Sequence, residues 1–149
     1  MSSAFLDTSA LTRRYHRSET GANRVREICA PSRRHVLLVA RLASIELAAA
    51  LNRRVRDGTL PAQVRDRYWR MFQVDWAEQY QVVQPNEMVF VRAEALARRY
   101  PLRTLDALQL ASALVAAAAA PGLKLQFWTA DAQQARAAES EGLTTELVA

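Results

Sequence analysis

The chain has 149 residues, of which 50% are hydrophobic and 23% charged, and this balance is typical of a single soluble globular domain spanning residues 1–149. Its one cysteine, Cys29, excludes an internal disulfide framework and a cysteine-rich zinc site. The longest apolar stretch, 105–120, is interrupted by polar residues and is too short to span a bilayer, and the first residues do not resemble a signal peptide. We therefore expect a cytoplasmic protein with no membrane association.

Basic residues exceed acidic ones by twenty to fifteen, which gives a net charge of +5. All but one of the basic residues are arginine, and the exception is Lys124. Arginine makes forked contacts to phosphate and stacks on nucleobases. Two interpretations fit this composition equally well: attraction to nucleic acid, and an arginine-rich surface that is only solvated. Net charge bears on association and not on fold.

Short apolar runs alternate with helical patterns along the chain. In chain order, the patterns predict a strand at 5–6, helices at 8–15 and 19–30, a strand at 35–40, helices at 43–56 and 61–77, a strand at 80–83, helices at 87–99 and 104–118, a strand at 125–128, a helix at 132–141 and a last strand at 144–148. Strands separated by helices of this length indicate crossover units. The sequence therefore predicts an α/β fold with a central parallel β-sheet of four to five short strands, flanked by helices on both faces.

Two acids follow predicted strands directly. Asp7 comes after the first strand and Asp131 after the fourth, and a helix follows each of them. Either acid alone is well explained as a helix N-cap. In open parallel sheets, however, sites form at the carboxyl ends of the strands, so two such acids on neighbouring strands favour a shared site.

Two further acids lie on apolar helices. Glu46 has alanine and leucine at its helical neighbours, which favours partial burial over the solvated surface position that is usual for a mid-helix glutamate. Asp106 lies in the first turn of the most apolar helix, where Thr104 is a candidate N-cap and the helix dipole alone would favour an acid. A carboxylate buried on such a helix needs a partner.

Four carboxylates brought together repel one another unless a divalent cation neutralises them. Mg²⁺ suits a site of a few carboxylates and retained waters, and it can activate water and stabilise charge on a phosphate. The hydroxyl residues next to the acids are candidates for orienting a carboxylate or a bound water. They are Thr8, Ser9, Ser44 and Thr129.

The chain resembles the PIN-domain ribonucleases, and among them the VapC-type toxins of bacterial toxin–antitoxin pairs. Four stretches carry the resemblance and occur in the family's order: 5–11, 44–51, 100–113 and 129–143. The resemblance implies a PIN-like fold and a metal-dependent endoribonuclease that uses Mg²⁺ or Mn²⁺. Its acidic site carries over, as catalytic and metal-binding residues, to Asp7, Glu46, Asp106 and Asp131, and its supporting hydroxyl to Thr129, less directly to Thr8 or Ser9.

The resemblance also implies partners. They are an RNA substrate, expected to be single-stranded or looped because unstacked bases can enter a site, a cognate VapB-type antitoxin that blocks the acidic site, and a second copy of the chain in a homodimer. Gln109 stands where many relatives have histidine, at a position whose variability implies no effect on activity. The segment 60–83 matches no motif of the family.

Other side chains are weaker candidates. Arginines near the acids in sequence are candidates for phosphate contacts, although a solvated helix face is the simpler interpretation; they are Arg13, Arg14, Arg17 and Arg103. Tyr15 and Trp128 are candidates for base stacking, with core or dimer contacts as the simpler interpretation. His16 and His35 have no partner at ligand spacing.

Three other functions remain open. A phosphotransferase or phosphatase with an aspartyl-phosphate intermediate would need a second acid where Ser9 stands and a lysine, for which Lys124 is the single candidate. A non-catalytic PIN-fold module that binds RNA or an antitoxin would use the acids as caps or as a structural metal site. A nuclease acting on DNA would share the acidic chemistry.

Overall fold

The computed structural model describes residues 2–149 of the chain. The strands are β1 (Ser3–Leu6), β2 (Val36–Ala40), β3 (Tyr80–Val83), β4 (Leu125–Thr129) and β5 (Thr144–Leu147). The helices are α1 (Thr8–Tyr15), α2 (Ala22–Cys29), α3 (Ala43–Arg56), α4 (Ala62–Glu78), α5 (Glu87–Arg99), α6 (Thr104–Ala119) and α7 (Ala132–Ser140). Short 3-10 helices, η1 (Pro31–Arg33) and η2 (Pro121–Leu123), precede β2 and β4.

The strands form one parallel sheet in the order β3-β2-β1-β4-β5. In the register, Ser3 of β1 pairs with Val36 of β2 on one side and with Leu125 of β4 on the other. The predicted α/β fold with a parallel sheet and flanking helices is confirmed. Because the strands are parallel and β1 lies between β2 and β4, the residues that follow these three strands emerge close together at the same edge of the sheet.

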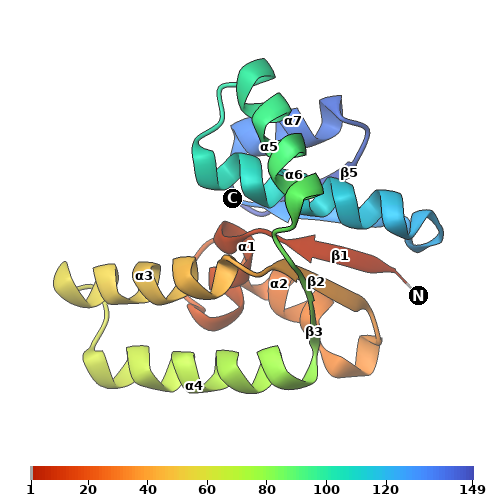
Figure 1. Ribbon diagram of the computed structural model, residues 1–149. Helices are drawn as coiled ribbons and strands as arrows, with labels where there is room; N and C mark the ends of the chain where they lie inside the picture. The colour runs from red at the N-terminus through yellow and green to blue at the C-terminus, as the bar shows by residue number, and fades with distance from the viewer. Residues whose placement is uncertain (1) are drawn as a thin grey trace.

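Two layers of helices cover the sheet, as Figure 1 shows. The side chains of β1 alternate between them: Ala4 and Leu6 join a core with α1, α2, α3 and α4, whereas Phe5 joins a second core with α5, α6 and α7. In the second core Phe5 stacks on Phe127 of β4, with ring centroids 5.8 Å apart. Alternation with a period of two fixes which face each strand residue covers.

The helix α6 is the most apolar one and packs most extensively against α5. The residue at its N-cap position is Arg103, whose side chain makes no capping hydrogen bond. Thr104 is the first residue of the helix, so the expectation that Thr104 is its N-cap is wrong. Neither α6 nor any other helix within residues 2–149 combines the length and apolar character needed to cross a membrane.

Most helix boundaries match the predictions to within two residues, and α2 is the exception. It was expected from residue 19 but begins at Ala22, because Gly21 adopts a left-handed conformation with φ of +85°. A Cβ atom at Gly21 would lie 2.0 Å from the carbonyl oxygen of Val148. The turn between α1 and α2 therefore lies directly against the end of the chain, a contact that local sequence patterns do not contain.

Candidate active site

A cavity of about 320 Å³ opens at the carboxyl edge of the sheet, and all four predicted acids line it. Asp7 follows β1 and Asp131 follows β4, while Glu46 reaches the cavity from the first turn of α3 and Asp106 from the first turn of α6. The other lining residues are Thr8, Ser9, Thr12, Ala49, Ala50, Arg53, Leu105, Gln109 and Gln134. Segments spread over the whole chain thus meet at one point.

Asp7 is the most deeply buried of the four acids, with 2% of its surface exposed. Its Oδ1 accepts hydrogen bonds from the Ser9 hydroxyl, at 2.6 Å, and from the backbone N–H of Ala10, at 3.0 Å. Its Oδ2 accepts one from the Thr129 hydroxyl, at 2.6 Å. Asp7 therefore caps α1, as the simpler interpretation held, and faces the cavity as well.

Burial raises the pKa of Asp7 to about 6, against the opposing effect of the three hydrogen bonds it accepts, and the nearby charge of Asp106 raises it further. The pKa of Asp106 is also raised, first by burial and then by the neighbouring carboxylates of Asp131 and Glu46. Asp106 is therefore close enough to each of the other three acids for electrostatic repulsion between them.

Glu46 is half-buried and held by two neutral donors. Its Oε1 accepts hydrogen bonds from the hydroxyl of Thr8 and from the side-chain N–H of Gln109, both at 2.8 Å. Gln109 also donates to the Thr8 hydroxyl oxygen, at 2.9 Å, so the three side chains form a closed triangle.

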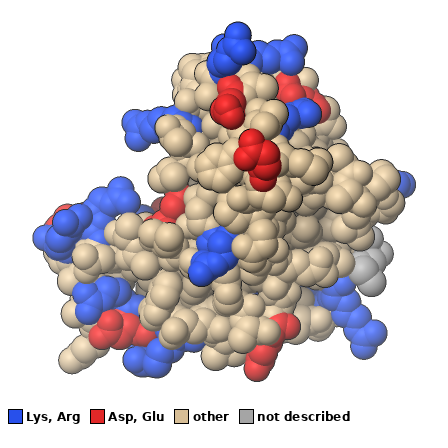
Figure 2. Space-filling model, in the orientation of Figure 1, with Lys and Arg blue, Asp and Glu red and all other residues tan. Residues whose placement is uncertain are grey.

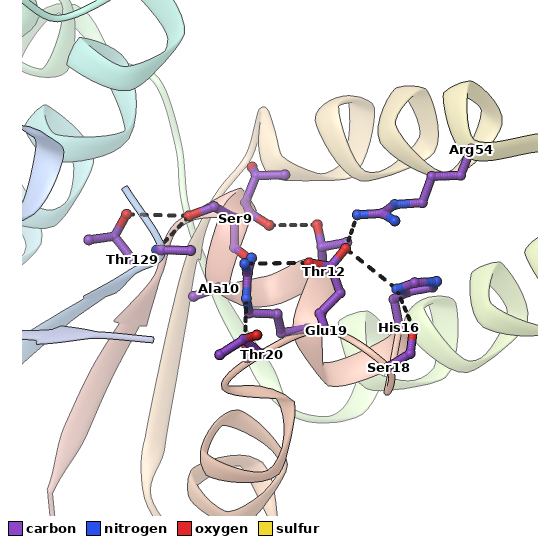
Figure 3. Close-up of polar contacts among 12 residues, drawn as sticks. Ser9, Ala10, Thr12, His16, Ser18, Glu19, Thr20, Arg54 and Thr129 are labelled. Atoms are coloured by element: carbon purple, nitrogen blue, oxygen red, sulfur yellow. Dashed lines mark hydrogen bonds and ion pairs between the residues drawn. The ribbon is translucent and has the colours of Figure 1, made fainter. Parts of the chain in front are cut away.

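Asp131 is exposed at the rim of the cavity and caps α7, since its Oδ1 accepts from the backbone N–H groups of Gln133, at 2.8 Å, and Gln134, at 3.2 Å. Its own N–H donates to the Thr129 hydroxyl at 3.0 Å. The Ser9 hydroxyl lies 3.3 Å from the Thr129 hydroxyl and accepts a hydrogen bond from the N–H of Ala130. Figure 3 shows the contact between Ser9 and Thr129. Hydroxyls thus connect the ends of β1 and β4.

None of the four acids forms an ion pair within residues 2–149. Carboxylates gathered in a partly buried cavity without a cationic side chain paired to them leave a local excess of negative charge. In the described part of the chain, no three His, Cys, Asp or Glu side chains converge as a ready-made metal cage. Mg²⁺ commonly uses one or two carboxylates and keeps several waters, so the donor set fits such an ion without a closed cage.

Two of the four candidate arginines have structural partners. Arg13 donates to the carbonyl oxygens of Ser9 and Thr20, both at 2.7 Å, and closes the turn between α1 and α2. Arg14 donates to the hydroxyl of Tyr80, at 2.8 Å, on the side of α1 that faces β3. The solvated-face interpretation of these two is wrong, since both side chains are largely enclosed by protein.

Arginines do flank the cavity, but only one of them was predicted. Arg103 is the exposed N-cap residue directly before α6, and its charge acts to lower the pKa of Asp106. Arg53 is exposed and lines the cavity directly, and sequence analysis missed it although it lies seven residues after Glu46, on the same face of α3. In Figure 2 basic side chains gather at this end of α3, whose last turn carries Arg53, Arg54 and Arg56.

Several other predictions concerning side chains are wrong or find simpler explanations. Ser44 hydrogen-bonds with Arg41 and lines a separate groove between α3 and α4 instead of the cavity. Tyr15 is fully buried, with its hydroxyl donating to Asp75, and Trp128 is buried against the core, so neither is placed to stack on a base. These are the core contacts that were the simpler interpretation.

The two histidines have local roles. His16 lies 3.5 Å from Glu19, which also pairs with Arg54 of α3 (Figure 3). His35 shares a hydrogen bond with Ser2 at the opposite edge of the sheet. Lys124 lies at that opposite edge too, directly before β4, so it cannot serve the phosphotransferase chemistry for which it was the one candidate.

Comparisons with known proteins identify the family and the fold. The family model described as PIN domain matches residues 4–140. No curated protein sequence matches the chain.

Solved structures share the fold at low sequence identity. A toxin–antitoxin complex from Klebsiella pneumoniae is 15% identical, with a TM-score of 0.60 and 88% of each chain covered. VapBC2 from Rickettsia felis, bound to a DNA fragment from its promoter, is 9% identical, with a TM-score of 0.65 and coverage of 97% of this chain and 98% of that one. FitAcB from Neisseria gonorrhoeae is 11% identical, with a TM-score of 0.56 and 95% of each chain covered. Since the family model spans nearly the whole sequence, the chain belongs to the PIN domain family.

Proposed function

We propose that this protein is a divalent-metal-dependent endoribonuclease that acts as the toxin of a toxin–antitoxin pair. PIN domains are generally nucleases, which supports hydrolysis of nucleic acid at a coarse level. The observation that carries the proposal is the cavity in which Asp7, Glu46, Asp106 and Asp131 meet without an ion pair within residues 2–149.

These four carboxylates would hold Mg²⁺ or Mn²⁺, directly or through water. When bound, such an ion lowers the pKa of water and stabilises charge on a phosphate undergoing in-line displacement. Glu46, which has one oxygen held by Thr8 and Gln109, would either share in holding the ion or accept a proton from the attacking water.

The remaining polar groups would orient the acids and the substrate. Ser9 and Thr129 fix both oxygens of Asp7, so this carboxylate cannot rotate away from the cavity. Arg53 and Arg103 would neutralise the phosphates on either side of the scissile bond. The substrate class is single-stranded or looped RNA, whose unstacked bases can be splayed around a cavity of this size.

The partners follow from the proposed role. A VapB-type antitoxin would inhibit the enzyme in the cytoplasm, and two copies of the chain would form a homodimer. Support for the antitoxin comes from one of the neighbouring structures, which is a toxin–antitoxin complex. Size measurement of the purified protein, alone and with the product of an adjacent small open reading frame, tests both partners.

The activity is tested with purified protein free of antitoxin, on RNA and DNA oligonucleotides of the same sequence. We expect cleavage of RNA with Mg²⁺ or Mn²⁺, loss of cleavage with a chelator, and a rate lowered about 100-fold or more by Glu46→Gln. Glu94→Gln is the matched control, because it removes the same charge from an exposed position on α5. Cleavage that a chelator leaves intact would contradict the metal requirement, and preferred cleavage of DNA would contradict the substrate class.

A non-catalytic module that binds RNA or an antitoxin is the second candidate. It is favoured by the fact that two of the acids, Asp7 and Asp131, already serve as helix caps. Folded wild-type protein that binds RNA but leaves it intact under all metal conditions would support this candidate.

A further inference from the structure

Gln109 is an unusual residue for its position. It lies in the apolar helix α6 with 2% of its surface exposed, among side chains that pack in the second core. Its Nε2 donates to Oε1 of Glu46, at 2.8 Å, and to the hydroxyl of Thr8, at 2.9 Å. Its Oε1 is buried and has no hydrogen-bond partner within residues 2–149.

The contact connects the two helical layers of the protein. Glu46 belongs to α3, which covers one face of the sheet, and Gln109 belongs to α6, which covers the other. Both donors to Glu46 bind the same oxygen, Oε1, whereas Oε2 accepts no hydrogen bond within residues 2–149. The carboxylate is therefore held from one side and leaves its second oxygen available to the cavity.

The chemistry of the donor is suited to this task. An amide N–H directs the carboxylate without neutralising it, whereas a lysine or arginine at position 109 would pair with Glu46 and compete with a bound cation. A glutamine that served packing alone would carry the penalty of an unpaired buried carbonyl for no benefit, since an apolar side chain of the same shape avoids that penalty. The two hydrogen bonds that Gln109 donates into the cavity therefore point to a role in the site.

We propose that Gln109 is a positioning residue, whose side-chain amide fixes the orientation of the Glu46 carboxylate for binding the cation and for hydrolysis. The inference rests on the proposed function and adds a residue that the acidic motif does not contain. It replaces the expectation, drawn from the variability of position 109, that the residue there does not affect activity. The proposed action of Gln109 is indirect, because this residue lines the cavity but donates its hydrogen bonds to Glu46 and Thr8.

The test compares three variants on the full chain. Gln109→Met keeps the length and shape of the side chain and removes the donor. Gln109→His restores a neutral N–H donor on a side chain of similar reach. Ser112→Ala is the matched control, because it removes another buried hydrogen-bonding group from α6, one that donates to the carbonyl oxygen of Leu108 and lies outside the cavity.

The Kd for Mn²⁺ is measured without RNA by calorimetry, and kcat and KM are measured on an RNA oligonucleotide. We expect Gln109→Met to weaken Mn²⁺ binding and to lower kcat by about 10- to 100-fold, which is the effect of losing a group that orients a metal ligand. KM for RNA and the urea midpoint stay close to those of the wild type. Gln109→His recovers most of the loss, and Ser112→Ala changes neither Mn²⁺ binding nor kcat.

A double-mutant cycle tests whether Gln109 acts through Glu46. In a Glu46→Gln background, Gln109→Met is expected to cause no further loss of Mn²⁺ affinity, and additive losses would overturn the inference. The inference would also be overturned if Gln109→Met kept the Mn²⁺ affinity and kcat of the wild type, or if Ser112→Ala lost as much of both as Gln109→Met. A wild type that binds no Mn²⁺ and cleaves no RNA overturns the proposed function itself, which separates that failure from a failure confined to Gln109.

Discussion

The hydroxyl of Thr129 donates to Oδ2 of Asp7 across 2.6 Å and at the same time accepts from the backbone N–H of Asp131 at 3.0 Å. One hydroxyl thus joins the acids that follow the two adjacent strands β1 and β4. Because it is a neutral group, it aligns Asp7 without reducing the negative charge of the cavity.

Replacing Thr129 by valine preserves the shape of the side chain and removes this hydrogen bond. The bond lowers the pKa of Asp7, so we expect Thr129→Val to raise that pKa further and to reduce RNA cleavage about 10- to 100-fold. Cleavage rates at several pH values measure both effects. Thr145→Val is the control, since it removes the hydrogen bond to Glu139 from the neighbouring strand, outside the cavity, and an equal loss there would contradict the prediction.

The raised pKa of Asp7 makes the stability of the metal-free protein depend on pH. A carboxyl group with a pKa of about 6 in the folded state and 3.8 as its ordinary value holds its proton more tightly when folded, so its contribution to stability falls as the pH rises from about 4 to above 6. Asp7→Asn cannot ionise and keeps an oxygen that can accept the cap hydrogen bonds. Between pH 4 and pH 8 we expect the free energy of unfolding of the wild type to fall by about 2 kcal/mol relative to that of this variant, measured by urea unfolding with a chelator present.

If the free energy of unfolding depended on pH in the same way for both proteins over that range, this would contradict the pKa assigned to Asp7. Adding Mg²⁺ or Mn²⁺ at pH 8 is a further check. The cation is expected to raise the urea midpoint of the wild type more than that of Asp7→Asn, because binding to the folded state alone stabilises it.

Arg53 is expected to bind an RNA phosphate beside the cavity. Arg53→Gln should raise KM for RNA with little change in kcat, and should reduce the slope of log affinity against log salt concentration by about 1. Arg56→Gln is the control, because Arg56 has the same charge and exposure in the same turn of α3 but does not line the cavity. Identical effects of the two substitutions would show that only overall charge matters.

The turn at Gly21 allows a prediction about stability alone. Gly21 and Gly58 have similar positive φ angles, +85° and +81°, but a Cβ atom would meet Val148 at Gly21 and no atom within 4 Å at Gly58. Gly58→Ala should lower the free energy of unfolding by about 1–2 kcal/mol, because alanine is disfavoured in the left-handed backbone conformation. Gly21→Ala should cost about 1–3 kcal/mol more, because the end of the chain must move. Urea unfolding of both variants measures the difference, and equal costs would contradict the close contact.

Features that follow from local sequence patterns, or from the parallel direction of the strands, were predictable from the sequence. The helix 43–56 was predicted with both ends correct, because its alanine-rich pattern stops at Asp57 and Gly58. The gathering of Asp7 and Asp131 at one edge follows from parallel strands, whose carboxyl ends share an edge. The start of α2 was not predictable, because it depends on a contact between Gly21 and Val148, at opposite ends of the chain.

Side-chain partners were predicted less well, because they too depend on contacts between residues that are far apart in the sequence. Arg13 and Arg14 lie near Asp7 in sequence, but a helix turns them away from the cavity and toward Thr20 and Tyr80. Arg53 lies far from Asp7 in sequence and beside the cavity in space. For Arg53 the signal was present in the helical spacing from Glu46, whereas the partners of Arg13 and Arg14 required the tertiary structure.

The order of the strands also determines when the cavity can form during synthesis. The chain is made from β1 onward, and Asp7, Glu46 and Asp106 all precede β4, which must be inserted next to β1 before Thr129 can bond to Asp7. A nascent chain that has not yet exposed β4 to solvent therefore carries three of the acids but lacks Asp131 and the hydroxyl that orients Asp7. The complete acidic cavity can therefore form only after β4 and Asp131 have been synthesised.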